Sequence, residues 1–422
     1  MNRAFLKSEV SDKKVTFLVY SFVRQNKKEP RKVKKKSNIR EECLIDLGSL
    51  YKRLASLSDS RNRQGLRYSL PMILALMIMA KLSGEDTPSG IADWASYRGK
   101  ELAKLLQLKR KTMPHHSTYR RIMAEVIDTD ELEFFVSDYL VGKQYFGKKV
   151  LLSIDGKTLR GTLNDKQEGT YLLAAYLPSE GLVLMEVEVE GKGKEIPAAL
   201  KLLKKLDLRE KIVIGDALHT QREASKEICV AGGDYIWYAK GNQSQMEEDI
   251  RLWFEPEPIP IPGQGRFPKD FESAKTTNKG HGRIDERKIT VSSQLNDFLD
   301  WPFLKQVFKL ERRVTNIKTG QVKERVVYGF TSLARDEVAP GELLTLIRSY
   351  WGIENGLHYR RDVTLLEDRT RITNKKAGHV MACINNLVLG LVIGKKKFKY
   401  LPAARRYFNA NFPKAFEFIE GL

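Results

Sequence analysis

Two aspartates stand at the ends of apolar segments that have the pattern of buried strands. The segment VLLSIDGKTLRG, residues 150–161, runs from apolar residues directly into Asp155, and the segment KIVIGDA, residues 211–217, does the same at Asp216. An unpaired carboxylate at such a place is costly to desolvate, so each acid is expected to have a partner or a ligand. The sequence therefore singles out Asp155 and Asp216 as candidate functional residues.

The order of the surrounding elements predicts that these two acids lie side by side. From residue 148 the chain reads as three strands, a helix, a fourth strand, a second helix and a fifth strand. This order predicts a mixed five-stranded sheet in which a right-handed crossover places the fourth strand parallel to the first. Carboxylates at neighbouring strand ends repel one another unless a cation lies between them. Oxygen ligands without clustered cysteine or histidine favour Mg²⁺ or Mn²⁺ over zinc.

A third acidic ligand is expected from a later helix. In the segment IRSYWGIENGLHYRRDVTLLEDRTR, residues 347–371, Glu354 is predicted to face the sheet. Arg361, seven residues later, is predicted to share that face, and His358 lies one turn from Glu354. Cations beside an acid suit a metal site next to a phosphate. The other acids of this segment are expected to be solvated or paired in salt bridges: Asp362, Glu367 and Asp368.

Each candidate also has a purely structural interpretation. A single aspartate at a strand end often caps a loop or pairs with a lysine, but two of them, with a glutamate on a later helix, favour metal chemistry. Lys157 and Lys240 are candidate phosphate contacts, and an ordinary surface lysine is the alternative for both.

The charge balance points to a polyanionic partner. The 422 residues hold 73 Lys or Arg against 53 Asp or Glu, a formal net charge of +20, and such a surface attracts nucleic acid. In residues 1–40 alone, 13 basic residues stand against three acids. This arm is predicted to be disordered and to contact DNA phosphates, which adds affinity without sequence selectivity.

Residues 41–147 have the apolar spacing of helices and are predicted to form a helical domain associated with DNA binding. The segment MPHHSTYRRIMAEV, residues 113–126, resembles a helix-turn-helix recognition element that carries Arg120 and Arg121. An ordinary surface helix is the alternative for this segment.

Two features bear on the compartment. The most apolar run, LPMILALMIMAKL at residues 70–82, is shorter than the roughly 20 residues that span a bilayer. It predicts a buried helix, and no membrane partner is expected. The cysteines are too few and too scattered for a disulfide framework or a zinc site, which favours a reducing cytosol: Cys43, Cys229 and Cys383. The expected location is the bacterial cytoplasm, in association with the nucleoid.

Several sequence blocks resemble the signature blocks of DDE transposases. In chain order they are SIDGKTLRG, IGDALHTQ, GGDYIWYAKGNQ, KGHGRID and WGIENGLHYRRDV, followed by EDRTR. Upstream, DSRNRQGLRYSL and MPHHSTYRR are similar to the helical domain that precedes the catalytic domain in that family. The resemblance is strongest to the H-repeat-associated (ISAs-type) branch of bacterial insertion-sequence transposases and covers residues 45–395.

The resemblance implies a ribonuclease-H-like α/β catalytic domain, and its three acids are Asp155, Asp216 and Glu354. In related insertion-sequence transposases a tyrosine, an arginine and a lysine surround the catalytic glutamate. Here Tyr350 occupies the place of that arginine and Arg361 the place of that lysine, so the phosphate contacts depart from the family pattern. The expected organisation is a basic arm, a helical domain, a catalytic domain with a β-rich insertion, and a C-terminal tail: residues 1–40, 41–147, 148–395 with the insertion at 241–340, and 396–422.

The expected activity is DNA transposition with two Mg²⁺ or Mn²⁺ ions as cofactors. Water frees a 3′-OH at the element end, and that 3′-OH attacks target DNA, with a homodimer expected in the DNA complex. One rival is a metal-dependent nuclease or resolvase that cuts DNA without joining it. The other is a DNA-binding relic of a transposase that no longer catalyses.

Overall fold

The computed structural model describes most of the chain after the basic arm. The described residues are 50–62, 64, 66–141, 149–164, 169–191, 193–255, 268–394, 398 and 400–421. The predicted basic arm at residues 1–40 lies outside them, so its order and its contacts stay predictions.

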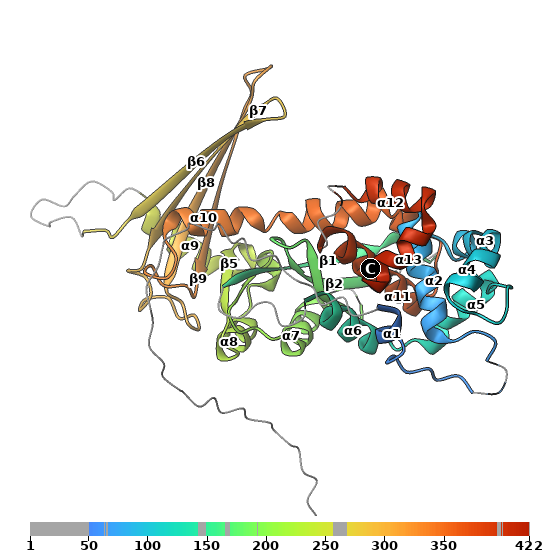
Figure 1. The fold of residues 1–422 in the computed structure, drawn as a ribbon. Helices are drawn as coiled ribbons and strands as arrows, with labels where there is room; N and C mark the ends of the chain where they lie inside the picture. The colour runs from blue at the N-terminus through green and yellow to red at the C-terminus, as the bar shows by residue number, and fades with distance from the viewer. Residues whose placement is uncertain are drawn as a thin grey trace, which may run out of the picture. The chain divides into compact units, whose positions relative to one another are not determined.

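One large mixed sheet organises the described part of the chain (Figure 1). Its strand order is β3-β2-β1-β4-β5-β9-β8-β7-β6. The first five strands are β1 Val150–Leu159, β2 Thr170–Leu177, β3 Leu182–Glu188, β4 Lys211–Ile214 and β5 Asp234–Ala239. The other four are β6 Glu272–Gly280, β7 Arg283–Ser292, β8 Gln306–Asn316 and β9 Val322–Thr331.

The first five strands confirm the predicted neighbours. β1 and β2 pair antiparallel, as do β2 and β3, whereas β4 pairs in parallel with β1 and β5 pairs in parallel with β4. The crossover helices are α7, Glu195–Lys205, and α8, Arg222–Val230. Their apolar faces pack on one side of the sheet in a shared core with α9, Ser244–Phe254.

The prediction of a five-stranded sheet is wrong in its extent, because nine strands of the described residues form this sheet. β9 pairs antiparallel with β5, and β8, β7 and β6 follow outward. An edge strand carries a row of unpaired backbone groups, and β9 satisfies those of β5. The strands of the predicted β-rich insertion therefore continue the sheet of the first five strands, and Figure 1 shows β6, β7 and β8 in a long twisted ribbon that extends past the helices. β8 and β9 form a hairpin that turns at residues 317–321.

The helices before β1 do not form a core of their own. They are α1 Leu50–Leu54, α2 Leu70–Leu82, α3 Pro88–Tyr97, α4 Gly99–Leu105, α5 His116–Arg121, the π-helical Ile122–Val126, and α6 Thr129–Val141. They share one apolar core with α11, Lys375–Gly394, α12, Leu401–Ala410, and α13, Phe412–Glu420. The segment predicted as a tail is thus largely two helices, and residues 44–422 form one compact unit.

Two apolar helices lie in this core. α2, predicted as a buried helix, is buried at every position except Pro71. α11 is the one helix among the described residues that is long and apolar enough to cross a membrane, and 89% of its apolar window is buried inside the protein. That is the environment of a core helix.

The helix that carries Glu354 changes its winding along its length. It begins as α10, Pro340–Ser349, and continues through two π-helical segments, Ile353–His358 and Arg360–Thr364. A π-helix bonds residue i to i+5 and so holds more residues in each turn than an α-helix does. Residues seven apart therefore no longer share one face, which matters for the side chains that follow Glu354.

Candidate active site

Asp155 lies where the parallel part of the sheet opens. β1 and β4 pair only as far as Ser153 and Ile214. Beyond that point β1 continues, paired with β2 alone, to Leu159. The prediction that the strand ends at Asp155 is therefore wrong, but the acid still lies two residues beyond the last β1–β4 pair, on the side that β4 has left free.

Asp216 and Glu354 face the same opening from two other elements. Asp216 follows β4 and caps the short 3₁₀ turn Ala217–His219, where its carboxylate accepts the backbone N–H of Leu218 at 2.9 Å. Glu354 is exposed on the first π-helical segment. All three acids line one cavity of about 230 Å³.

The three carboxylates interact electrostatically. Burial raises the pKa of Asp155 to about 7, and repulsion from Asp216 and Glu354 adds to that rise, while a hydrogen bond from the Gly156 backbone opposes it. A cation beside Asp155 would offset this repulsion.

The three carboxylates are suitable ligands for a hard divalent cation, but they are too far apart to coordinate one ion together. Carboxylate oxygens are the ligands that Mg²⁺ prefers in proteins. Within the described ranges, however, no group of three His, Cys, Asp or Glu side chains is close enough to hold an ion. A divalent ion shared by the three acids would therefore require their carboxylates to move closer together.

Tyr171, Glu195 and Gly156 are neighbours of Asp155 that sequence reasoning missed. Tyr171 donates a hydrogen bond to Glu195, and the Glu195 charge also acts on Asp155. The Tyr171 hydroxyl lies over Gly156, where a Cβ would come within 2.1 Å of it. A larger residue at position 156 would therefore require the Tyr171 ring to move. No local pattern marks these residues, because they meet only through the β1–β2 pairing and the start of α7.

The two candidate lysines differ in their surroundings. Lys240 lines the cavity, and its ammonium lies 5.7 Å from the centre of the Tyr238 ring. Lys157 has a side chain only 9% exposed and forms ion pairs with Asp362 at 2.5 Å and Asp368 at 3.7 Å. Lys240 is available to a phosphate in the cavity, whereas Lys157 is already neutralised by the acids predicted to form salt bridges.

His358 and Arg361 do not provide free cations beside Glu354. Burial, followed by the charges of Arg361 and Lys157, lowers the pKa of His358 to about 3, so the imidazole is neutral. The Arg361 side chain is fully buried. The predicted phosphate contact of Arg361 is therefore incorrect, and the π-helical winding explains why: seven residues do not return to the face of Glu354.

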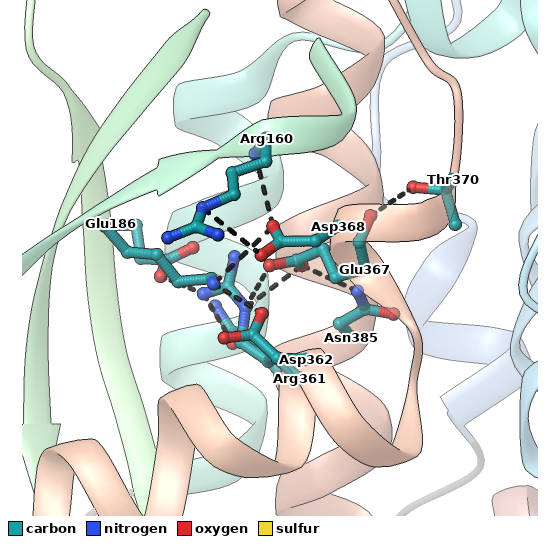
Figure 2. A network of polar contacts seen from close by, with 10 residues as sticks. Arg160, Glu186, Arg361, Asp362, Glu367, Asp368, Thr370 and Asn385 are labelled. Carbon is teal, nitrogen blue, oxygen red and sulfur yellow. Dashed lines mark hydrogen bonds and ion pairs between the residues drawn. The ribbon is translucent and has the colours of Figure 1, made fainter. Parts of the chain in front are cut away.

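Arg361 instead joins three elements in a buried polar network. Figure 2 shows its guanidinium between Glu186 of β3 and Glu367. Its Nε donates to the two carboxylate oxygens of Glu367 at 3.0 and 2.9 Å, and Nη1 donates to Glu186. Asn385 of α11 donates to Glu367 at 2.8 Å. The network fixes the end of the helix that carries Glu354 to β3 and α11.

The remaining candidates lie away from the acids. Arg120 and Arg121 are both exposed at the end of α5, and Arg120 donates to the Ser89 hydroxyl at 3.4 Å. Both stay available to DNA, and their role stays a prediction. The large aromatic residues of the sheet region are core residues rather than exposed stacking platforms, as their burial shows: Trp237, Tyr238 and Trp301.

Comparison with known proteins identifies the family. The model of the family described as "Transposase DDE domain" matches residues 146–391, and that of the family described as "DDE_Tnp_1-associated" matches residues 51–140. The chain is thus a transposase, and it belongs to the DDE family. The predicted resemblance to the H-repeat-associated branch is confirmed by the relatives that the chain matches.

Two relatives from Escherichia coli illustrate the match. The H repeat-associated putative transposase YhhI of strain K12 is 25% identical over 84% of this chain and 93% of its own length. The putative transposase YncI of strain O157:H7 is 27% identical over 84% of this chain and 90% of its own length. Among solved structures, a piggyBac transposase synaptic complex with hairpin DNA aligns over 89% of this chain and 80% of that chain, with a TM-score of 0.41 and 11% identity. A likeness this distant carries no argument about this chain.

Proposed function

We propose that this transposase cuts DNA at the ends of an insertion element and joins the freed 3′-OH to target DNA by metal-dependent phosphoryl transfer on a ribonuclease-H-like core. The observation that carries the proposal is the composition of one cavity. It brings Asp155, Asp216 and Glu354 together with basic side chains from the sheet and from α10. A phosphodiester needs both kinds of group, because it is itself an anion and gains charge as it reacts.

The three carboxylates would hold Mg²⁺ or Mn²⁺, with two ions proposed. Such ions supply activation of the attacking oxygen and stabilisation of charge on the scissile phosphate. The chain's own part is to bind and orient the DNA. Lys240 presents a cation at the end of β5, beside the cavity that Asp155 and Asp216 line. Tyr350 and Trp351 line the same cavity.

The test separates cutting from joining. Purified protein is incubated with double-stranded DNA that carries the element end, with and without a target plasmid, and products are resolved by size. Cleavage together with joined products supports transposition. Cleavage without any joined product in the presence of target identifies a nuclease, and binding without cleavage identifies a relic.

Activity is expected with Mg²⁺ or Mn²⁺ and very little with Ca²⁺. Calcium accepts more ligands in looser geometry, so it occupies carboxylates without the alignment that in-line attack requires. The measurement is the cleavage rate at matched concentrations of each ion after removal of metal with EDTA. Full activity in EDTA would contradict the proposed chemistry.

Removal of residues 1–38 is expected to weaken binding to unrelated DNA and to element ends by similar factors. The arm carries an excess of basic residues, and removing one phosphate-binding cation lowers the slope of log affinity against log salt by roughly 0.9. Titrations of both DNAs at several salt concentrations measure the slope. A weakening confined to the element end would mean that the arm reads sequence, and an unchanged slope would mean that it does not touch DNA.

A further inference from the structure

Three arginines lie in one row across the ribbon that extends the sheet. Arg287 of β7 is directly opposite Arg312 of β8, and Arg312 is directly opposite Arg325 of β9. Residues directly opposite one another in an antiparallel pair project from the same face, and like charges in that position destabilise the sheet. We call these three residues the arginine row. Its cost to the fold calls for a compensating anion.

The chain itself supplies one carboxylate to the row. Asp285 accepts hydrogen bonds from Nη2 of Arg287 and from Nη2 of Arg312, each at 2.8 Å. Arg325 forms no ion pair with any described residue. Nη1 of Arg287 is buried and has no hydrogen-bond partner in the described part of the protein. An unpaired buried donor of a charged group costs more than an ordinary one, so an acceptor from outside the described residues would stabilise this atom.

The row lies on the same cavity as the three acids. Arg287, Arg312 and Arg325 all line it, and so does Arg348 at the end of α10. α10 packs on the apolar part of this sheet face through Leu343, Leu344 and Ile347. No ion pair among the described residues joins the row to Asp155, Asp216 or Glu354. The cavity therefore has a basic side and an acidic side that do not neutralise each other.

We propose that the arginine row, together with Arg348, is a phosphate-binding subsite that holds the DNA backbone next to the phosphate that reacts at the carboxylates. The assignment rests on the proposed action on DNA and adds to it the residues that hold the strand. Guanidinium groups bind phosphate oxygens through paired N–H donors, and several of them around one cavity place a backbone phosphate at a fixed distance from the acids.

The electrostatics of Arg287 agree with this geometry. Burial lowers its pKa, Arg312 and Arg348 lower it further, and Asp285 opposes the change. Crowded cations of this kind gain stability when an anion arrives. A structural role for the row is the competing explanation. It predicts that substitution lowers the Tm, because a stabilising residue would be lost.

The test uses Arg325→Gln and Arg312→Gln in the full chain, with Arg313→Gln as the matched control. Arg313 is the neighbour of Arg312 on β8, projects from the other face and forms a surface ion pair with Glu324 at 3.4 Å. Two probes are used in EDTA. One is a short random-sequence DNA duplex, titrated at several salt concentrations, and the other is inorganic sulfate, whose effect on Tm is compared with chloride at equal ionic strength.

We expect each row variant to bind the duplex about tenfold more weakly than wild type, as for the removal of one charge-assisted hydrogen bond. The salt slope should fall by roughly 0.9 for each phosphate that the variant no longer neutralises. Sulfate should raise the Tm of wild type and of Arg313→Gln, and raise that of Arg325→Gln less. Without sulfate, Arg325→Gln should melt no lower than wild type, because it removes a like-charge neighbour.

Three results would overturn the subsite. In the first, both row variants bind the duplex as tightly as Arg313→Gln does. In the second, the Tm of Arg325→Gln without sulfate is clearly lower than that of wild type. In the third, the variants lose the sulfate effect on Tm but keep the duplex affinity of wild type, which would assign the row to a free anion. Any of these leaves the transposase proposal standing if wild type still cleaves with Mg²⁺. Conversely, weaker duplex binding by the row variants with no cleavage by wild type would retain the subsite and remove the proposed chemistry.

Discussion

Asp155→Asn, Asp216→Asn and Glu354→Gln are each expected to lower the rate of DNA cleavage by at least about 10²–10³-fold, the effect measured when one electrostatic stabiliser of a transition state is removed. An amide keeps the size of each side chain but removes the charge that would hold a divalent ion. Asp216→Asn also keeps the cap on the 3₁₀ turn, because asparagine caps as well as aspartate does. Folding and DNA binding are therefore expected to persist.

The measurement is the single-turnover cleavage rate at saturating DNA, with Tm and DNA affinity recorded for the same preparations. Glu342→Gln is the matched control for Glu354, because Glu342 is an exposed acid in the first turn of α10. Asp362→Asn serves for the aspartates, since Asp362 pairs with Lys157 rather than facing the cavity. Wild-type cleavage by any of the three test variants would exclude that residue from the site.

Arg361→Met is expected to lower the free energy of unfolding by about 3–5 kcal/mol, the cost of breaking a buried ion pair by removing one partner. The substitution leaves the buried carboxylates of Glu186 and Glu367 without their cation. Arg361→Lys should recover part of this stability, because an ammonium restores the charge but not the two-sided contact of a guanidinium. Urea unfolding followed by circular dichroism measures each difference.

Arg369→Met provides the control, because Arg369 is exposed and close in sequence to Arg361. Its effect should stay within about 0.5 kcal/mol, as for other surface substitutions. If Arg361 acted on DNA instead, Arg361→Met would keep wild-type stability and bind DNA more weakly. That outcome would restore the phosphate contact expected from the sequence.

The local elements and the neighbouring positions of the two aspartates could be predicted from the sequence. Apolar spacing of period two or of about 3.6 residues reports a strand or a helix directly, because each side chain's exposure follows from its own position along the chain. The nearness of Asp155 and Asp216 followed from the handedness of crossover connections, which leaves few ways to place β4. The structure agrees, with β4 parallel to β1.

The roles of the cations could not be predicted from the sequence. From the sequence, three residues are expected to be unpaired cations beside an acid: Lys157, His358 and Arg361. Burial and the acids of other elements determine their charge state and their partners. The π-helical winding after Ser349 also changed which face each residue presents. The sequence does not show whether an arginine binds a phosphate or pairs with a buried glutamate, because its partner depends on the surrounding elements.

The arginine row shows the same limit at the level of the sheet. The β segments of the insertion were visible, but a strand's own pattern does not say which residue of another strand stands opposite it. Register alone placed Arg287, Arg312 and Arg325 on one line, and the pairing of β9 with β5 brought that line to the cavity of the acids.

The sequence by itself determined the strands, the helices and the two aspartates at adjacent strand ends. The tertiary structure decided which charges are neutralised inside the protein and which remain for a ligand, because desolvation and pairing depend on neighbours that lie far away along the chain.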